Sequence, residues 1–165
     1  MALDPVSVLQ NAVFVAVAVG IYGWVVAFFW SPFLLSSRIR MLLDVLPPRN
    51  WQWNYPLWMP LPGATWGFIW GATLAISSDL QPPEATIGAA AFDGLVAATG
   101  FSLPFWPAVL LVGLPARGYD WYPDNERLRT ALLVIGGTIW YLLFIVVPMY
   151  YLSLLAGIGG AMTGG

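Results

Sequence analysis

The stretch VSVLQNAVFVAVAVGIYGWVVAFFW, residues 6–30, decides the class of fold because it contains no charged residue. As a helix that rises about 1.5 Å per residue, it is long enough to cross a hydrocarbon layer of roughly 30 Å. Asp4 and Pro5 stand directly before it. A side-chain oxygen at the N-cap followed by proline is a typical helix start. We therefore expect a membrane-spanning helix over residues 6–30.

The composition of the whole chain agrees with this stretch. Hydrophobic residues make up 59% of the sequence and charged residues only 8%, whereas soluble domains carry about 25% charged residues. This small number of charged residues cannot cover a water-facing surface. Lipid must therefore surround most of the outer face. We expect an all-α, polytopic membrane helix bundle with about four transmembrane helices and an interfacial amphipathic helix, forming a single integral-membrane domain over residues 1–165.

Three further apolar segments complete the predicted bundle: residues 61–78, 85–114 and 126–156. The middle one contains Pro104 and Pro107, which should kink or break a helix. It is therefore either one kinked crossing or a half-helix that returns to the side from which it entered. The positions of the arginines, described below, favour the single kinked crossing.

Residues 32–62 form the predicted interfacial segment. In its first part, one helical face is apolar and carries Leu35, Ile39, Leu42, Leu43 and Leu46, which is typical of a helix that lies in the membrane interface. Pro47 and Pro48 end that helix. Residues 49–62 combine three prolines with several tryptophans, so we expect irregular structure there, with the rings at the level of the lipid headgroups.

The arginines indicate the topology. If every apolar segment crosses once, all six arginines lie on one side, within residues 31–62 and 115–129, and the other side carries only Asp4, Asp79 and Glu84. The positive-inside rule then predicts a multi-pass protein of the cell membrane with cytoplasmic arginine-bearing segments and both termini outside. A re-entrant third segment would place Arg117, Arg127 and Arg129 outside, which disfavours it.

Missing residue types exclude several classes of chemistry. The chain has no cysteine, no histidine and no lysine, which excludes thiolate metal sites, serine–histidine–aspartate hydrolysis and Schiff-base cofactors. Asp120, Asp124 and Glu126 lack the spacing of a calcium loop and have arginines as neighbours. We therefore predict no catalytic residue, no metal and no cofactor. A net charge of −2 also excludes nucleic-acid binding.

Asp93 is the one ionisable residue well inside an apolar segment. A charged carboxylate at mid-membrane costs roughly 2.5–3.5 kcal/mol. The helical face of Asp93 is otherwise made of small residues, which suggests that it faces another helix: Ala89, Ala90, Ala97 and Gly100. Asp93 is thus a candidate ion or proton site. Two structural interpretations compete with that one: a neutral acid bonded across helices, or a residue near the outer interface if the helix begins near Thr86.

Other candidate positions concern surfaces and packing. Arg38 and Arg40 are candidate contacts for lipid headgroups. Trp51, Trp53 and Trp58 form either an interfacial aromatic belt or a surface for a partner. Two stripes of small residues predict close helix packing, within this chain or against another: Gly63, Gly67, Gly71 and Ala90, Gly94, Ala98.

Two functional hypotheses remain. The first is a non-catalytic membrane subunit that packs against other membrane subunits, or against copies of itself, within a larger complex. The second is a homo-oligomeric channel or transporter in which Asp93 titrates. The expected partners are membrane lipids and membrane proteins. A lipid-modifying enzyme is disfavoured, since the only acidic cluster has neither histidine nor lysine beside it.

Overall fold

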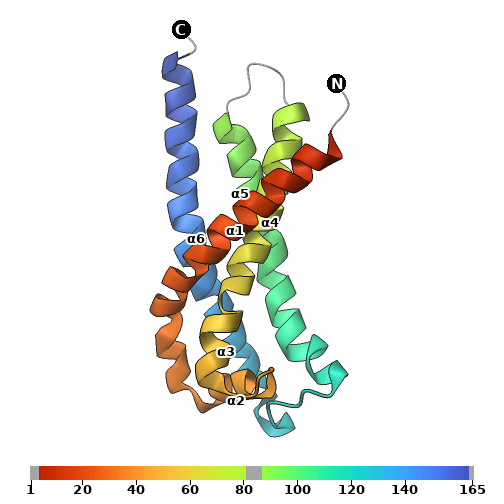
Figure 1. The fold of residues 1–165 in the computed structure, drawn as a ribbon. Coiled ribbons are helices and arrows are strands. Elements are labelled where there is room, and N and C mark those ends of the chain that lie inside the picture. Colours follow the sequence, from red (N-terminus) through yellow and green to blue (C-terminus); the bar gives the residue numbers. More distant parts are fainter. Residues whose placement is uncertain (1–3, 81–86, 164–165) are drawn as a thin grey trace.

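The computed structural model describes residues 4–80 and 87–163 of the 165-residue chain, and these residues form helices joined by short turns (Figure 1). Four long helices run along the molecule: α1 Pro5–Trp30, α4 Pro60–Leu80, α5 Ile87–Ala108 and α6 Arg127–Thr163. Two short helices, α2 Ser37–Val45 and α3 Trp51–Trp58, lie at the lower end in Figure 1. The predicted all-helical class is confirmed for the described residues.

Three stretches are long and apolar enough to cross a membrane: Pro5–Leu35, Gly88–Arg117 and Arg127–Leu155. They match three of the predicted spans and make the chain a helical membrane protein. The fourth predicted span corresponds to α4, whose glycine, tryptophan, threonine and proline residues lower its mean hydropathy. α4 packs against α1 on one side and α5 on another. A helix covered in this way exposes less of its surface to lipid.

The start of α1 is built as the sequence predicts. The Asp4 side chain accepts hydrogen bonds from the backbone N–H groups of Val6 and Ser7, at 3.1 and 3.3 Å. These bonds satisfy two of the N–H groups that have no partner inside a helix. Ser31 and Pro32, in contrast, begin a short 3-10 helix, and α2 follows at Ser37.

The glycine stripe of α4 packs against α1 within the same chain. A Cβ atom on Gly67 would lie 2.8 Å from the backbone oxygen of Val15, and one on Gly71 would lie 2.9 Å from that of Asn11. On Gly63 it would lie 2.9 Å from the oxygen of Val19. No side chain fits at such distances, so the two helices approach along bare backbone. The partner of this stripe, which the sequence leaves open, is therefore α1.

The second stripe packs α5 against α4. The indole of Trp70 covers Gly94, and its Nε1 donates a hydrogen bond of 2.8 Å to the backbone oxygen of Ala91. Ala90 and Ala98 are buried on the same side of α5. One turn away from Trp70 along α4, Trp66 is fully buried and donates from Nε1 to Oγ1 of Thr99 at 3.1 Å.

The proline-bearing part of α5 neither breaks nor turns back. α5 continues through Pro104 and Pro107 to Ala108, and a π-helical turn, Val109–Gly113, follows it. There the N–H of Leu114 bonds to the backbone oxygen of Val109, five residues earlier, at 2.8 Å. Proline lacks an N–H group, so the hydrogen-bond register after it can shift to the wider π pattern. Within the described residues, the re-entrant alternative is not observed.

Residues 51–58 are helical, so the prediction of irregular structure throughout residues 49–62 is wrong. The Asn50 side chain accepts a hydrogen bond of 3.0 Å from the N–H of Gln52, and the Asp44 carboxylate accepts one of 2.8 Å from the N–H of Trp51. These two acceptors satisfy first-turn N–H groups of α3 and allow a short helix to begin there. The many prolines and tryptophans of residues 49–62 favoured the prediction of irregular structure, and these two capping side chains were not considered in it.

Candidate functional site

The two arginine-bearing segments meet at one end of the bundle. Nε and Nη2 of Arg38, on α2, both donate to Oε2 of Glu126, at 2.8 and 2.6 Å. Glu126 stands directly before α6, at the end of the 3-10 turn Asp124–Glu126. This is the one ion pair among the described residues. It joins positions 88 residues apart in the sequence and fixes α2 across the base of α6.

Asn54 connects α2 to α3 and was missed by the sequence analysis. Its side chain is fully buried, and Nδ2 donates to the backbone oxygens of Leu43 and Leu46 at 2.6 and 2.7 Å. The last carbonyl groups of a helix have no partner inside it, and here the Asn54 amide provides one for α2. In the sequence, Asn54 stands between Trp53 and Tyr55 in a segment rich in tryptophan and proline, and that pattern indicated the membrane interface and not a buried residue.

Aromatic side chains close the space between α1, α3 and α6. The ring of Trp30 stacks on Phe33 and Tyr55, with centroid distances of 4.9 and 6.2 Å. The Tyr55 hydroxyl donates to the backbone oxygen of Ala27. Burial raises the pKa of Tyr55 to about 12, so this hydroxyl remains a donor even at an alkaline pH at which an exposed tyrosine loses its proton.

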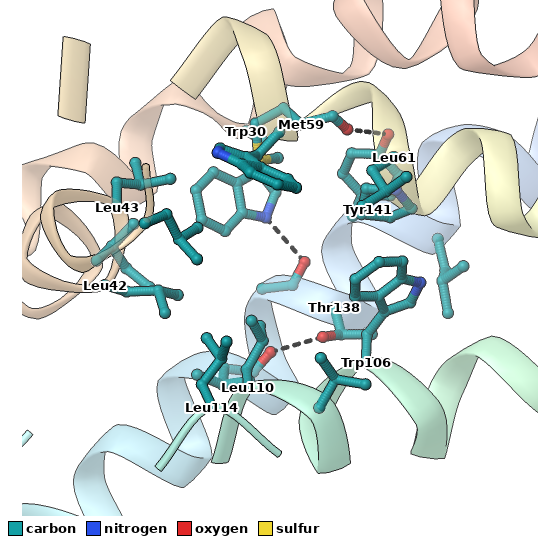
Figure 2. Close-up of a pocket in the computed structure, with 18 residues that line it drawn as sticks. Trp30, Leu42, Leu43, Met59, Leu61, Trp106, Leu110, Leu114, Thr138 and Tyr141 are labelled. Atoms are coloured by element: carbon teal, nitrogen blue, oxygen red, sulfur yellow. Dashed lines mark hydrogen bonds between the residues drawn. The ribbon is translucent and has the colours of Figure 1, made fainter. Parts of the chain in front are cut away.

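Below these rings lies an apolar cavity of about 200 Å³ (Figure 2). Residues of all six α-helices, α1 to α6, and of the turns beside them line it, and nearly all of them are apolar. Four polar groups in its wall donate to backbone oxygens: Trp30 Nε1 to Gly137 at 2.9 Å, Tyr141 OH to Met59 at 2.7 Å, Thr138 Oγ1 to Val134 at 2.9 Å, and Trp58 Nε1 to Pro47 at 3.1 Å. They are therefore already satisfied.

Trp106 differs from these groups. It also lines the cavity, but its Nε1 is buried and has no hydrogen-bond acceptor among the described residues. A buried donor without an acceptor costs about 1–3 kcal/mol. Such a donor in an otherwise apolar cavity is available for a hydrogen bond to a group from outside the chain. Trp106 is a candidate binding residue that the sequence analysis did not single out, because tryptophans are frequent throughout the chain.

A second, more polar hollow of about 320 Å³ lies beside the loop between α5 and α6. Asp120 and Arg127 line it together with Trp121 and Tyr122. The indole of Trp121 and the hydroxyl of Tyr122 donate to the backbone oxygens of Leu110 and Leu111, both at 2.9 Å. These two rings hold the loop against the π turn and satisfy its carbonyl groups.

Asp93 is exposed on the outward side of α5, together with Ala89, Ala97 and Gly100, while Ala90 is buried. The prediction that Asp93 faces another helix and forms an ion or proton site stays a prediction. The contact of Trp70 with Gly94 and Ala91 fixes the rotation of α5 and turns Asp93 outward. The described residues contain no group of three acidic side chains placed to hold a metal ion.

The remaining predicted positions lie around the arginine-bearing end. Arg40 is exposed on α2, while Arg38 is half-buried in its ion pair. Trp53 is 71% exposed, and Trp51 packs at the margin of the core. Trp58 donates from Nε1 to the backbone oxygen of Pro47 at 3.1 Å. Their contacts with lipid or partners stay predictions. Glu84 and Thr86 lie outside the described residues, as does the side chain of Asp124.

Long apolar helices, small-residue packing and tryptophan bonds to backbone oxygens together define a helical membrane protein. The chain belongs to the family described as a domain of unknown function (DUF8162), whose model matches residues 10–160. The match extends from α1 into the last turns of α6, so the whole bundle belongs to the family unit. No curated protein and no solved structure matches the chain.

The ion pair gives a testable prediction. Arg38→Glu places two like charges together and should lower the free energy of unfolding in detergent by about 1 kcal/mol, because a partly exposed pair contributes modestly. The double variant Arg38→Glu/Glu126→Arg should recover most of that loss. Arg40→Glu, on the exposed side of the same helix, is the matched control and should change little. An equal loss in both single variants would contradict the assigned role of Arg38.

Proposed function

We propose that the chain crosses the membrane four times, with α4 as the additional span and α2 in the cytoplasmic interface. The Arg38–Glu126 bond supports this, because it requires both arginine-bearing segments to lie on one side. The chain then crosses an even number of times between residues 38 and 126. Since α5 is one crossing, α4 is the other. The beginning of α1 and the end of α6 also lie at the same, upper end in Figure 1.

The placement of α2 in the interface follows from the difference between its buried side and its exposed side. Ile39, Leu42 and Leu43 are buried against the bundle, and Arg40 is exposed. A short helix with this distribution at the end of a bundle suits the layer between lipid and water. In this arrangement Arg40 reaches the headgroups, and all six arginines lie on the cytoplasmic side, as the positive-inside rule favours.

Within this topology, we propose that the protein is a non-catalytic membrane subunit that packs into a larger complex. The observation that carries the proposal is the outward side of α5, where the small residues Ala89, Ala97 and Gly100 are exposed. Small residues allow another helix to approach closely. Because α4 and α6 pack on other sides of α5, this side is available to a neighbouring protein.

The inside of the bundle supports a packing role as well. Several of its polar contacts between helices are tryptophan and tyrosine side chains bonded to backbone oxygens, such as Tyr22 to Phe144 at 3.1 Å and Trp70 to Ala91 at 2.8 Å. Such bonds fix helices relative to one another. The alternative is a homo-oligomeric channel or transporter. Since Asp93 is exposed, its pathway would run between copies, and Asp93→Asn would then abolish flux without reducing expression.

Purification in nanodiscs, with mass analysis of everything that elutes, tests the subunit proposal. We expect a partner in fixed stoichiometry. Gly100→Leu should release it, because the larger side chain blocks the outward side of α5. Gly136→Leu on α6 is the matched control, since Gly100 and Gly136 both have open space where a side chain would be. A protein without partners would contradict the proposal, and a pure homo-oligomer would favour the channel.

A further inference from the structure

We propose that the apolar cavity between α2 and the rest of the bundle binds part of one hydrocarbon chain of an anionic membrane lipid, and that Trp106 donates a hydrogen bond to an oxygen near the head of that lipid. This inference rests on the four-span arrangement proposed above, which places the arginine-bearing end at the membrane interface. It does not depend on whether the protein is a subunit or a channel.

The wall of the cavity suits a hydrocarbon chain. Leu42 and Leu43 of α2 lie on one side, and Leu110 and Leu114 lie on another (Figure 2). Ile39 and Val134 also line the cavity. The volume of about 200 Å³ is too small for a large cofactor and sufficient for part of an acyl chain. Dry apolar cavities of similar size bind small apolar guests.

Water does not suit this cavity. A buried water needs two to four polar partners. The polar groups of Trp30, Trp58, Thr138 and Tyr141 are already bonded to backbone oxygens, which leaves the Nε1 of Trp106 as the one unsatisfied side-chain donor in the described wall. One donor in an apolar surround fits a guest that is mostly hydrocarbon and carries an oxygen acceptor.

The position of the cavity indicates which guest this is. Leu61, at its margin, is 43% exposed, so the cavity lies close to the lipid-facing surface. Ile39 in its wall is flanked by Arg38 and Arg40, and Arg40 is exposed. A lipid whose chain enters the cavity therefore has its head near the exposed guanidinium of Arg40, whereas Arg38 is already paired with Glu126. That combination favours an anionic lipid over a neutral one.

Two variants test the proposal in the purified protein. Val134→Phe fills part of the cavity, because Val134 is 3% exposed and lines it. Trp106→Phe keeps an aromatic ring in place and removes the five-membered part of the indole together with its N–H group. Trp53→Phe, at an exposed tryptophan, is the matched control. The probes are phosphatidylglycerol and phosphatidylcholine with identical chains, added in detergent and counted by native mass spectrometry.

The wild-type protein should retain one phosphatidylglycerol molecule with at least about tenfold preference over phosphatidylcholine. Val134→Phe should reduce its retention about tenfold or more, and Trp106→Phe about threefold to tenfold, as expected for the loss of one hydrogen bond. If Val134→Phe does not fold, the retention of phosphatidylglycerol by Trp106→Phe tests the proposal on its own. Equal retention by wild type and Trp106→Phe, equal binding of the two lipids, or capture of a neutral isoprenoid alone would overturn the proposal.

Discussion

Gly67→Leu should prevent the chain from accumulating as a folded bundle. A Cβ atom added at this position would lie 2.8 Å from the backbone oxygen of Val15 and 2.8 Å from Cβ of Val19. Neither backbone nor a β-branched side chain can withdraw without separating α1 from α4. Overpacking by a few methylene groups costs about 1–3 kcal/mol, so a whole leucine side chain here should cost more than about 3 kcal/mol. The measurement is thermal unfolding in detergent, followed by size-exclusion chromatography.

Gly136→Leu provides the matched control for this variant. Gly136 lies on another long helix, and a Cβ there would meet no atom within 4 Å. Its melting temperature should equal or exceed that of the wild type, because glycine is less favourable than leucine inside a helix. If Gly67→Leu and Gly136→Leu had the same melting temperature, that result would contradict the close packing of α4 against α1.

Trp66→Ala should produce the second large effect, a loss of about 3–5 kcal/mol in the free energy of unfolding. Trp66 is fully buried between α4 and α5 and donates to Thr99 at 3.1 Å. Its removal therefore leaves both a cavity and an unpaired hydroxyl. Trp66→Phe keeps most of the ring and should cost only about 1 kcal/mol through the lost hydrogen bond.

Trp53→Ala is the comparison for the tryptophan series. Trp53 is 71% exposed, so its removal should change the free energy of unfolding by no more than about 0.5 kcal/mol. A loss at Trp53 as large as that at Trp66 would mean that α3 is buried against the bundle in a different orientation. A small loss at both positions would contradict the packing of α5 on α4.

The long helices were predictable because each is a local property of its own residues. Uninterrupted apolar runs and the Asp4–Pro5 start place α1 within one residue of its observed beginning at Pro5. The glycine stripe of α4 likewise predicted close packing. Its partner could not be predicted, since α1 and α5 are both long and apolar, and only the complete set of contacts selects between them.

The candidate site was predicted less well because it is made by contacts between distant residues. The bond between Arg38 and Glu126 spans 88 positions, and nothing in either local sequence identifies the other. The outward rotation of Asp93 depends on how Trp70 packs against α5. The donor of Trp106 becomes notable only when the acceptors around it are known. Local patterns carry none of this information.

The measurement that most directly tests the four-span arrangement is labelling of single cysteines at Ser37 and Asn125, both exposed, one in each arginine-bearing segment. The chain has no cysteine of its own, so a membrane-impermeant maleimide reports only the introduced thiol. The arrangement predicts that Ser37→Cys and Asn125→Cys are both protected in intact cells and both labelled in inside-out vesicles. Labelling of the two positions from opposite sides would show that α4 does not cross and would contradict it.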